Sequence, residues 1–395
     1  MSYGFARRQP FKLIAAVDAE KAKPCEGFGK LGCNATYRAN IGLDPSDRDI
    51  AAIDPSEFLS ELSRVSPGFV RGSLTALLCC PPCTEFSRAK PANHLADQPG
   101  NSLIARCASF VEAFFPEFVV MENARELICG NHPRHYHGFV RRLEKLGYEV
   151  RGGVYLLTKY GLPQIRERAL IVASRISPAR DLDDLWEGWD ILPRATTVRH
   201  AIGHLAAIPL AAGTAHEAPG FASDLVRRRM EAIPANGGSW SDLAAHPKAD
   251  ELLIDSMKRR IARNDIGSHP DVYGRLCWDR PCVTIKRECS HVGNGRYAHP
   301  EQTRLLSVRE MALLQGFPDT YLFPSSSLTN RYRHIGDAVP PLISFQLSAL
   351  VHWMKTGTRP EPTDWILPGC SLRFHDVFKS GTDCTQDTPR HRLAN

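Results

Sequence analysis

The 395-residue sequence lacks any long apolar run. Residues 74–80 are interrupted only by Thr75, yet they fall far short of the roughly 18 residues that a membrane-spanning helix needs. Near the N-terminus, residues 13–17 are too few for the hydrophobic part of a secretory signal, which takes about 7 to 15 residues. We therefore expect a folded cytoplasmic protein without a membrane partner.

Glycine and proline number 29 each and are scattered, which excludes a fibrous or low-complexity chain. The 12 cysteines come without an export signal, so we expect reduced thiols rather than a disulfide framework. Lys and Arg exceed Asp and Glu by only 49 to 43, a balance that is compatible with a polyanionic partner without requiring one. At roughly 100 to 200 residues per domain, the length predicts two or three domains, or one domain with an insertion.

The first half of the chain alternates short apolar segments with helical patterns, which is typical of an α/β fold with a parallel sheet flanked by helices. A helical spacing of apolar residues runs from Leu103 to Phe114, and a second one from Phe139 to Leu146, with Gly147 placed to end that helix. The segments that we predict as strands are residues 13–17, 74–80, 118–121, 154–157 and 169–173.

The patterning also predicts a domain organisation. Residues 1–174 form the α/β core, and residues 175–295, rich in Pro, Gly, His, Trp and Arg, form an inserted or second domain. Regular patterning returns over residues 296–356, where Ser307 and Glu310 predict a capping box and Pro340-Pro341 open a final helix. Residues 357–395 show no pattern, and we interpret them as a C-terminal tail.

Reactive residues follow three of the predicted strands. Ligands of open α/β sheets bind outside the carboxyl ends of the strands, and Asp18, Glu20, Cys83 and Glu122 all lie at such ends. A thiol and a carboxylic acid in one crevice suggest covalent catalysis, and a further carboxylate could hold the hydroxyls of a ribose.

Each of these residues also has a simpler interpretation. A cysteine after a buried strand is often a packing residue, and Glu122 could cap a helix. Cys80-Pro81-Pro82-Cys83 is also a Cys-x-x-Cys, as in redox pairs and half zinc sites. A zinc site needs a second pair nearby, and the remaining cluster is irregularly spaced, so we predict no metal site. That cluster comprises Cys277, Cys282, Cys289 and His291.

Read together and in order, five segments resemble the motif series of the cytosine-C5 DNA methyltransferases. Their order along the chain matches that family, and five ordered matches are much harder to obtain by chance than one. The segments are Pro81-Pro82-Cys83-Thr84-Glu85-Phe86-Ser87, Glu122-Asn123-Ala124, Gln164-Ile165-Arg166-Glu167-Arg168, Arg304-Leu305-Leu306-Ser307 through Glu310 to Leu314-Gln315-Gly316-Phe317-Pro318, and Gly336-Asp337-Ala338-Val339-Pro340-Pro341.

The resemblance implies a catalytic role for four residues. Cys83 would be the nucleophile that adds to carbon 6 of cytosine, and Glu122 would engage N3 of the same ring. Arg166 and Arg168 would be the basic pair that positions the substrate, with Arg168 as the charge that lowers the pKa of the Cys83 thiol. This addition makes carbon 5 electron-rich enough to accept a methyl group.

The resemblance also implies a fold and a partner. It predicts a doubly wound, Rossmann-like methyltransferase sheet, with residues 175–295 as the smaller target-recognition domain. The partner would be double-stranded DNA, from which the target base is turned out of the helix at a cost of a few kcal/mol. Runs such as Arg227–Arg229 would suit phosphate contacts, although a solvated helix face explains them equally well.

For the cofactor, the resemblance implies S-adenosylmethionine. Either Asp18 or Glu20 would hold the ribose, and Asp49 and Ile50 would lie near the adenine. Leu103 would line the wall of the pocket. The last motif adds Asp337, Ala338 and Val339, and Asp337 stands where the family usually has Asn.

One family feature is not found in the sequence. The family begins with a strand that ends in a Phe-x-Gly-x-Gly-Gly turn, whereas residues 1–5 here resemble the residues after that turn. Truncation, a strand supplied by a separate chain, and a degraded relative are three explanations, of which we favour truncation. We expect a monomer unless a second chain supplies the strand, and weak binding of S-adenosylmethionine by the chain as printed.

The function expected from the sequence is therefore methylation of carbon 5 of cytosine within a short DNA sequence. The enzyme would be the modification half of a restriction-modification system, associated with the nucleoid and accompanied by a cognate restriction endonuclease. Two alternatives remain open, namely the same chemistry on RNA and a DNA-binding relative that has lost its cofactor site.

Overall fold

The computed structural model describes residues 1–20, 32–82, 103–264 and 271–381. A four-stranded sheet in the order β1-β2-β4-β3 lies at its centre. Strand β1 (Ala76–Cys79) runs parallel to β2 (Phe118–Ala124), while β4 (Glu167–Ser174) is antiparallel to both β2 and β3 (Glu149–Leu156). The expectation of a purely parallel sheet is thus wrong. The short connection from β3 to β4 leaves no room for the crossover helix that parallel neighbours require.

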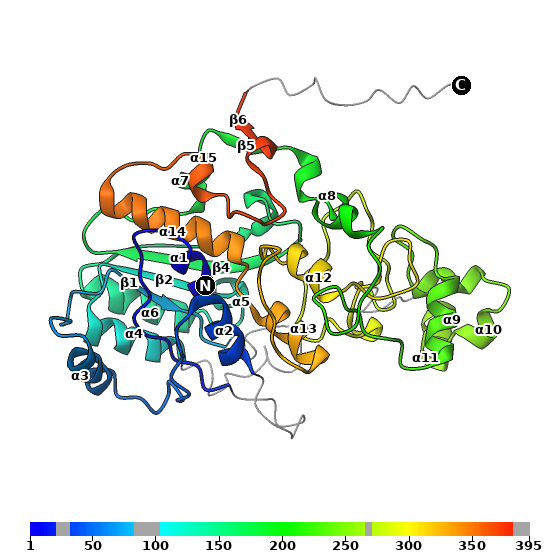
Figure 1. Ribbon diagram of the computed structural model, residues 1–395, viewed down its shortest axis with the longest axis horizontal. Coiled ribbons are helices and arrows are strands. Elements are labelled where there is room, and N and C mark those ends of the chain that lie inside the picture. Colours follow the sequence, from blue (N-terminus) through cyan, green and yellow to red (C-terminus); the bar gives the residue numbers. More distant parts are fainter. Residues whose placement is uncertain (21–31, 83–102, 265–270, 382–395) are drawn as a thin grey trace.

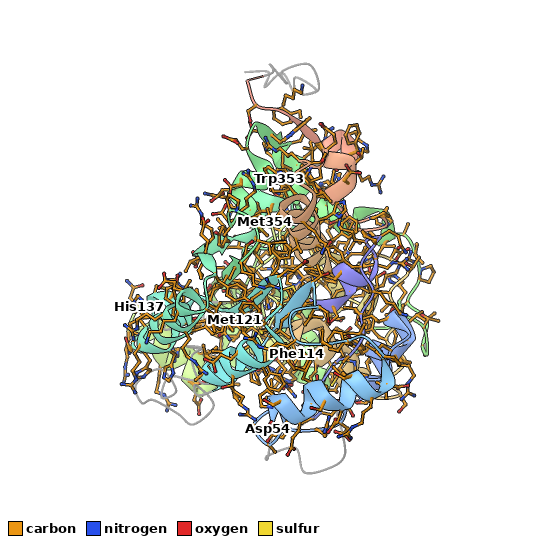
Figure 2. All side chains as sticks on the ribbon, turned by 90° about the vertical axis from the view of Figure 1, so that its left-hand side faces the viewer. Asp54, Phe114, Met121, His137, Trp353 and Met354 are labelled. Carbon is orange, nitrogen blue, oxygen red and sulfur yellow. The ribbon has the colours of Figure 1, made fainter. Side chains whose placement is uncertain are left out.

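Helices cover both faces of this sheet, as Figure 1 shows. Phe118 and Val120 of β2 pack toward α14 (Pro341–Thr356), whereas Val119 and Met121 pack toward α4 (Leu103–Phe114) and α6 (Arg134–Lys145). This alternation follows from the two-residue period of a strand. In Figure 2, Trp353 and Met354 of α14 lie above Met121, and Phe114 of α4 lies below it. The result is a doubly wound α/β core.

The sequence signals for helix ends are confirmed where the structure describes them. Gly147 follows α6 with φ +86° and Gly316 follows α12 (Val308–Leu314) with φ +81°, the left-handed conformation that glycine adopts without strain. At the start of α12, the Ser307 side chain accepts from the Glu310 amide and the Glu310 carboxylate accepts from the Ser307 amide. The predicted capping box is therefore present.

The strand predicted at residues 13–17 is wrong. Only Val17 pairs there, in one isolated parallel bridge with Ser46, and the Asp18 amide donates to the Ser46 carbonyl at 3.1 Å. Within the described residues, β1 forms its ladder with β2 alone. Apolar composition suggested a strand, but a strand also needs a neighbour along its length, and composition does not reveal one.

A second hydrophobic cluster extends from Val198 to Ile335 and joins the irregular region to the returning core. It includes buried residues of α9 (Asp224–Ala232), α12 and α13 (Leu328–Asp337). In Figure 1, α9, α10 (Ala249–Leu252) and α11 (Asp255–Ala262) form a lobe to one side of the sheet. That lobe therefore shares its packing with the segment that returns to the core.

The segment after α14 also contains regular elements, although its sequence shows no pattern. Strand β6 (Val377–Lys379) pairs antiparallel with β5 (Trp189–Ile191), and the rings of Trp186 and Trp365 lie 4.2 Å apart between centroids. Both tryptophans belong to the same cluster as α14. Residues 182–195 thus pack on the core, beyond the limit predicted at residue 174.

The remaining elements are short or lie at the periphery. No helix of the described residues combines the length and the apolar composition needed to span a bilayer. The nine cysteines within the described ranges are all free. The remaining elements are α1 (Ser2–Ala6), α2 (Cys33–Ile41), α3 (Pro55–Val65), α5 (Glu126–Cys129), α7 (Leu182–Trp186), α8 (Val198–Ile202), α10 (Ala249–Leu252), α11 (Asp255–Ala262), α15 (Pro362–Trp365), and the 3-10 helices η3 (Leu157–Tyr160), η4 (Pro193–Thr196), η5 (Gly203–Leu205), η6 (Trp240–Ala245), η7 (Val292–Asn294) and η8 (Phe374–Asp376).

Helix α1 packs closely on α14 at Gly4, which yields a stability prediction. A Cβ atom at Gly4 would lie 2.3 Å from the Phe345 nitrogen and from the Ser344 carbonyl carbon. We expect Gly4→Ala to lower the free energy of unfolding by about 2 kcal/mol, because the helices must separate. Gly138 in α6 has open space around it, so Gly138→Ala should instead stabilise by about 0.5 to 1 kcal/mol. Urea unfolding compares the two, and equal effects would contradict this packing.

Burial of His299 predicts a dependence of stability on pH. Burial, with the charge of Arg304, lowers the pKa of His299 from 6.5 to about 4. Between pH 4 and pH 6.5 the unfolded state binds a proton at His299 that the folded state does not. The contribution of His299 to the free energy of unfolding is therefore complete above pH 6.5 and falls toward pH 4. The loss should reach at most about 3 kcal/mol.

Urea unfolding from pH 7 to pH 4 measures this loss in the unaltered protein and in His299→Gln. The slope of stability against pH should be smaller in the variant. His137→Gln is the control, because the His137 side chain is exposed on α6 (Figure 2). Identical slopes in all three proteins would rule out His299 as the titrating group.

Candidate active site

Glu122 and Arg168 form an ion pair at the carboxyl end of β2. Arg168 Nε lies 2.9 Å from Glu122 Oε1, and the two side chains are 17% and 12% exposed. The antiparallel register sets Glu122 opposite Leu170 and Ala124 opposite Arg168, so the paired residues are diagonal neighbours on one face of the sheet. The structure therefore brings together two residues that lie 46 positions apart in the sequence.

The chain that leads to Cys83 passes beside this pair. Cys79 of β1 lies opposite Met121, and the buried Asn123 side chain donates from Nδ2 to the Pro81 carbonyl at 3.2 Å. Residues 79–82 thus run alongside the end of β2. Cys83 itself lies outside the described residues.

Arg166 has a different environment from Arg168. Its side chain is only 3% exposed, and Nη1 donates to the Ile285 carbonyl at 3.0 Å and to Gln164 Oε1 at 3.4 Å. The Ile285 amide donates to the same Gln164 oxygen at 3.0 Å. Arg166 therefore joins the connection before β4 to the segment that returns from the irregular lobe.

Gln315 is a buried residue that the sequence interpretation placed in a motif without assigning it a task. Its Oε1 accepts from Gln164 Nε2 at 2.6 Å, and its Nε2 donates to the Ala338 carbonyl at 3.0 Å. A glutamine between Leu314 and Gly316, directly after an apolar helix, is a polar residue at an apparently apolar position. This contrast was the signal in the sequence that could have indicated Gln315, since a buried side-chain amide needs hydrogen-bond partners.

Asp337, at the end of α13, pairs with Arg287, whose Nη1 lies 2.6 Å from Asp337 Oδ2. The guanidinium supplies the positive charge that balances a carboxylate at a position where the resemblance predicts Asn. The preceding residue, Gly336, allows a close approach, because a Cβ there would lie 2.3 Å from the Lys286 carbonyl oxygen. Ala338 and the buried Val339 follow directly.

Asp18 and Glu20 lie together beside the start of α2. The Glu20 amide donates to Asp18 Oδ1 at 2.8 Å, and the buried Glu20 carboxylate accepts from the Asn34 amide. Burial, together with the charges of Asp18 and Glu20, raises the pKa of Cys33. Asp18 is exposed, so its carboxylate is the more accessible of the two to a ligand.

Asp49, Ile50 and Leu103 lie on two neighbouring elements. Asp49 lines a cavity of about 230 Å³ that Arg48, Ile53 and Glu57 also line. The Ile50 carbonyl accepts from Arg106 Nε at 3.1 Å, and Arg106 lies one turn after Leu103 in α4. The structure thus places the segment predicted near the adenine against α4, one turn from Leu103, which is predicted to line the pocket wall.

Helix α2 connects the segment of Asp18 and Glu20 to the last motif, which contains Asp337. Thr36 Oγ1 lies 3.1 Å from His334 Nδ1 in α13, three residues before Asp337. The Val17–Ser46 bridge in turn joins the Asp18 segment to the segment that precedes Asp49. The residues predicted for the cofactor therefore lie on elements that contact each other in pairs.

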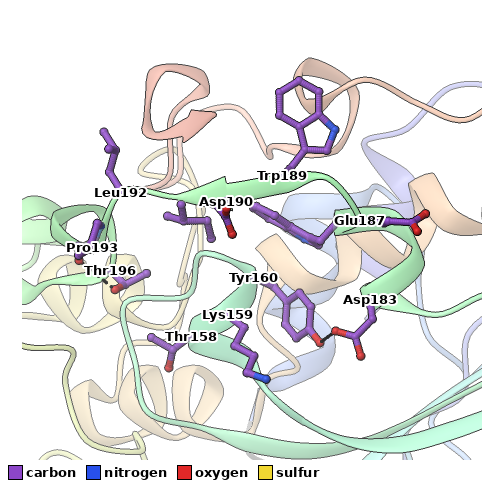
Figure 3. A pocket seen from close by; sticks show the side chains of 12 residues that line it. Thr158, Lys159, Tyr160, Asp183, Glu187, Trp189, Asp190, Leu192, Pro193 and Thr196 are labelled. Carbon is purple, nitrogen blue, oxygen red and sulfur yellow. Dashed lines mark hydrogen bonds between the residues drawn. The ribbon is translucent and has the colours of Figure 1, made fainter. Parts of the chain in front are cut away.

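A cavity of about 410 Å³ lies elsewhere, between η3, α7 and β5 (Figure 3). The Tyr160 hydroxyl donates to Asp183 Oδ1 at 2.7 Å in its wall, and Lys159 and Asp190 also line it. None of the residues predicted for catalysis or for the cofactor lines this cavity. We therefore do not include it in the candidate active site.

The sequence of this chain is similar to those of known proteins. The family described as C-5 cytosine-specific DNA methylase matches residues 1–350. The Type II methylase M.HgiDII of Herpetosiphon aurantiacus is 30% identical over 331 residues, which cover 80% of this chain and 86% of that protein. The Type II methyltransferase M.NgoFVII of Neisseria gonorrhoeae is 29% identical over 372 residues, with 89% of each chain covered.

Solved structures match the fold at low sequence identity. A putative DNA modification methyltransferase encoded within an Escherichia coli prophage aligns with a TM-score of 0.57 and 17% identity, covering 90% of this chain and 95% of that one. The Dnmt2 methyltransferase of S. pombe aligns with a TM-score of 0.51 and 15% identity, covering 89% and 95%. The predicted Rossmann-like methyltransferase fold is confirmed.

The Arg287–Asp337 pair generates a prediction that a double-mutant cycle can test. Asp337→Asn should lower the free energy of unfolding by about 0.5 to 1 kcal/mol in the unaltered protein, because Arg287 keeps only the more distant Glu288 as a carboxylate partner. The same change should cost less in an Arg287→Met background. Urea unfolding of the four proteins measures the coupling, which should shrink in 0.5 M NaCl because salt screens partly exposed charges. Additive effects would show that the pair contributes nothing.

Proposed function

The chain belongs to the C-5 cytosine-specific DNA methylase family, and we propose that it transfers a methyl group from S-adenosylmethionine to carbon 5 of a cytosine within a short sequence of double-stranded DNA. The membership confirms the resemblance seen in the motifs. The observation that best supports the proposal is the Glu122–Arg168 pair, held beside the chain that leads to Cys83. Two similar proteins are named Type II enzymes, which favours a modification enzyme with a cognate restriction endonuclease.

The proposed chemistry begins with the Cys83 thiolate adding to carbon 6 of a cytosine that has been turned out of the duplex. Glu122 acts in its protonated form and donates to N3, which takes up the electron density that the addition pushes into the ring; N3 returns the proton to Glu122 when the aromatic ring is restored. Arg168 contacts Oε1 of Glu122, and this contact orients the carboxyl group. The ring then becomes nucleophilic at carbon 5.

The last step restores the aromatic ring. A base removes the proton from carbon 5, the electrons of that bond reform the double bond between carbons 5 and 6, and the bond from carbon 6 to sulfur breaks. Cys83 leaves as the thiolate with which it began. Arg166, buried beside Ile285, acts in this proposal by holding the segment that carries Arg168.

When bound, S-adenosylmethionine supplies an electrophilic methyl group on a sulfonium. We assign the ribose hydroxyls to Asp18, because its carboxylate is exposed whereas that of Glu20 is buried on the Asn34 amide. We assign the adenine to the segment of Asp49 and Ile50, which contacts α4 one turn from Leu103. An exposed carboxylate suits the ribose hydroxyls, so Asp18 fits this part of the cofactor.

The last motif would close the pocket from the opposite side. There, Asp337 ends α13 and is followed by Ala338 and Val339, and α13 contacts α2 through His334. The Arg287 charge keeps the Asp337 carboxylate from adding an unbalanced negative charge to the pocket. We propose residues 175–295 as the part of the chain that reads the DNA sequence.

Cys83→Ala provides the test of this mechanism. We expect the variant to lose methyl transfer by at least about a thousandfold, because the loss of a covalent nucleophile removes the first step. DNA affinity should be unchanged, since the thiol acts after the base has been turned out. Transfer of tritiated methyl groups to duplex DNA measures the first quantity, and a gel-shift titration measures the second.

Cys129→Ala is the matched control, because Cys129 is an exposed free thiol to which the proposed mechanism gives no role. It should transfer methyl groups at the rate of the unaltered protein. Normal transfer by Cys83→Ala would contradict the mechanism. Transfer to transcribed RNA but not to DNA would favour the RNA enzyme, and DNA binding without any transfer would favour the non-catalytic relative.

A further inference from the structure

Two buried glutamines join the catalytic side of the candidate site to the side proposed for the cofactor. Gln164 and Gln315 are both 0% exposed, and their side-chain amides contact each other at 2.6 Å. We infer that Gln315 is a positioning residue that couples cofactor binding to the placement of the target base. This inference rests on the proposed function and goes beyond it.

Both side-chain amides have a single usable orientation. Gln164 donates from Nε2 to Gln315 and accepts at Oε1 from the Ile285 amide, while Gln315 donates from Nε2 to the Ala338 carbonyl. Turning over the Gln315 amide would set two NH₂ groups against each other and an oxygen against the Ala338 oxygen. The hydrogen bonds therefore form a chain in which donation runs from the Ile285 amide through both glutamines to the Ala338 carbonyl.

The two ends of this series of hydrogen bonds lie in different parts of the candidate site. Arg166 contacts both Gln164 and the Ile285 carbonyl, and it lies two residues before Arg168, which holds Glu122. Ala338 lies at the opposite end, between Asp337 and Val339 of the cofactor motif. A shift of the Ala338 peptide therefore strains the contacts that place the base-binding residues.

The packing around Gln315 is tight. The Leu342 amide donates to the Gly316 carbonyl at 3.1 Å, so the residue after Gln315 is also tied to the start of α14. A Cβ at Gly316 would lie 2.9 Å from a side-chain methyl of Leu162. Because packed interiors and buried polar networks respond to displacement as units, Gln315 transmits a change at one end to the other.

Gln346 allows a matched comparison. It is equally buried and also bridges two partners, accepting from Trp186 Nε1 at 3.1 Å and donating to the Tyr160 carbonyl at 2.9 Å. Those partners lie in the wall of the cavity in Figure 3 and not at Ala338 or Ile285. Replacing Gln346 therefore reproduces the loss of a buried amide without breaking the proposed coupling.

The experiment compares Gln315→Met and Gln346→Met with the unaltered protein. Methionine keeps the length of the side chain and removes both hydrogen bonds. We expect Gln315→Met to raise the KM for S-adenosylmethionine and to lower kcat, and to reduce by about tenfold the factor by which duplex DNA tightens cofactor binding. Gln346→Met should lower the melting temperature to a similar extent while leaving KM, kcat and that factor unchanged.

Gln315→Glu serves as a second variant in case the first does not fold. In its ionised form it keeps the acceptor for Gln164 and sets a second, negatively charged oxygen against the Ala338 carbonyl, so it should weaken cofactor binding while the KM for DNA stays the same. Methyl transfer by the unaltered protein, together with kinetics of both Gln315 variants that match those of Gln346→Met, would overturn the inference alone. Absence of transfer by the unaltered protein would overturn the proposed function and this inference with it.

Discussion

The candidate active site depends on the antiparallel register between β2 and β4. This register sets Arg168 diagonally across from Glu122 and lets their partly buried guanidinium and carboxylate groups meet at 2.9 Å. A shift of one residue would send Arg168 to the opposite face of the sheet and leave Glu122 without its partner. A carboxylate that must engage a base is therefore oriented by the sheet itself.

A second constraint is that the seam between the sheet and the returning segment is polar yet buried. Gln164, Arg166 and Gln315 meet there, and each contacts backbone groups from other parts of the chain. Such groups are tolerated in the interior because hydrogen bonds replace the water that they lose. The same bonds give the segments one relative placement, which an apolar seam of similar volume would specify less strictly.

The two sides of the site differ in how they are held. The catalytic side is built on regular strands, with Glu122 and Arg168 in β2 and β4. The proposed cofactor side is assembled from loops and helix ends, where α2 meets α13 through Thr36 and His334, and Asp337 is balanced by Arg287. Rigid elements thus position the chemistry, while short polar contacts join the parts that surround the ligand.

Much of this could be predicted from the sequence, because local patterns report local structure. Periodicity located α4 and α6, Ser307 and Glu310 marked the start of α12, and the ordered motifs indicated the family and the fold. The direction of β4, the single bridge at Val17 and the β5–β6 pairing depend on partners distant in sequence, so only the tertiary structure decided them. For the same reason Gln315 stood in a quoted motif, but its contacts with Gln164 and Ala338 became evident only when three separate segments came together.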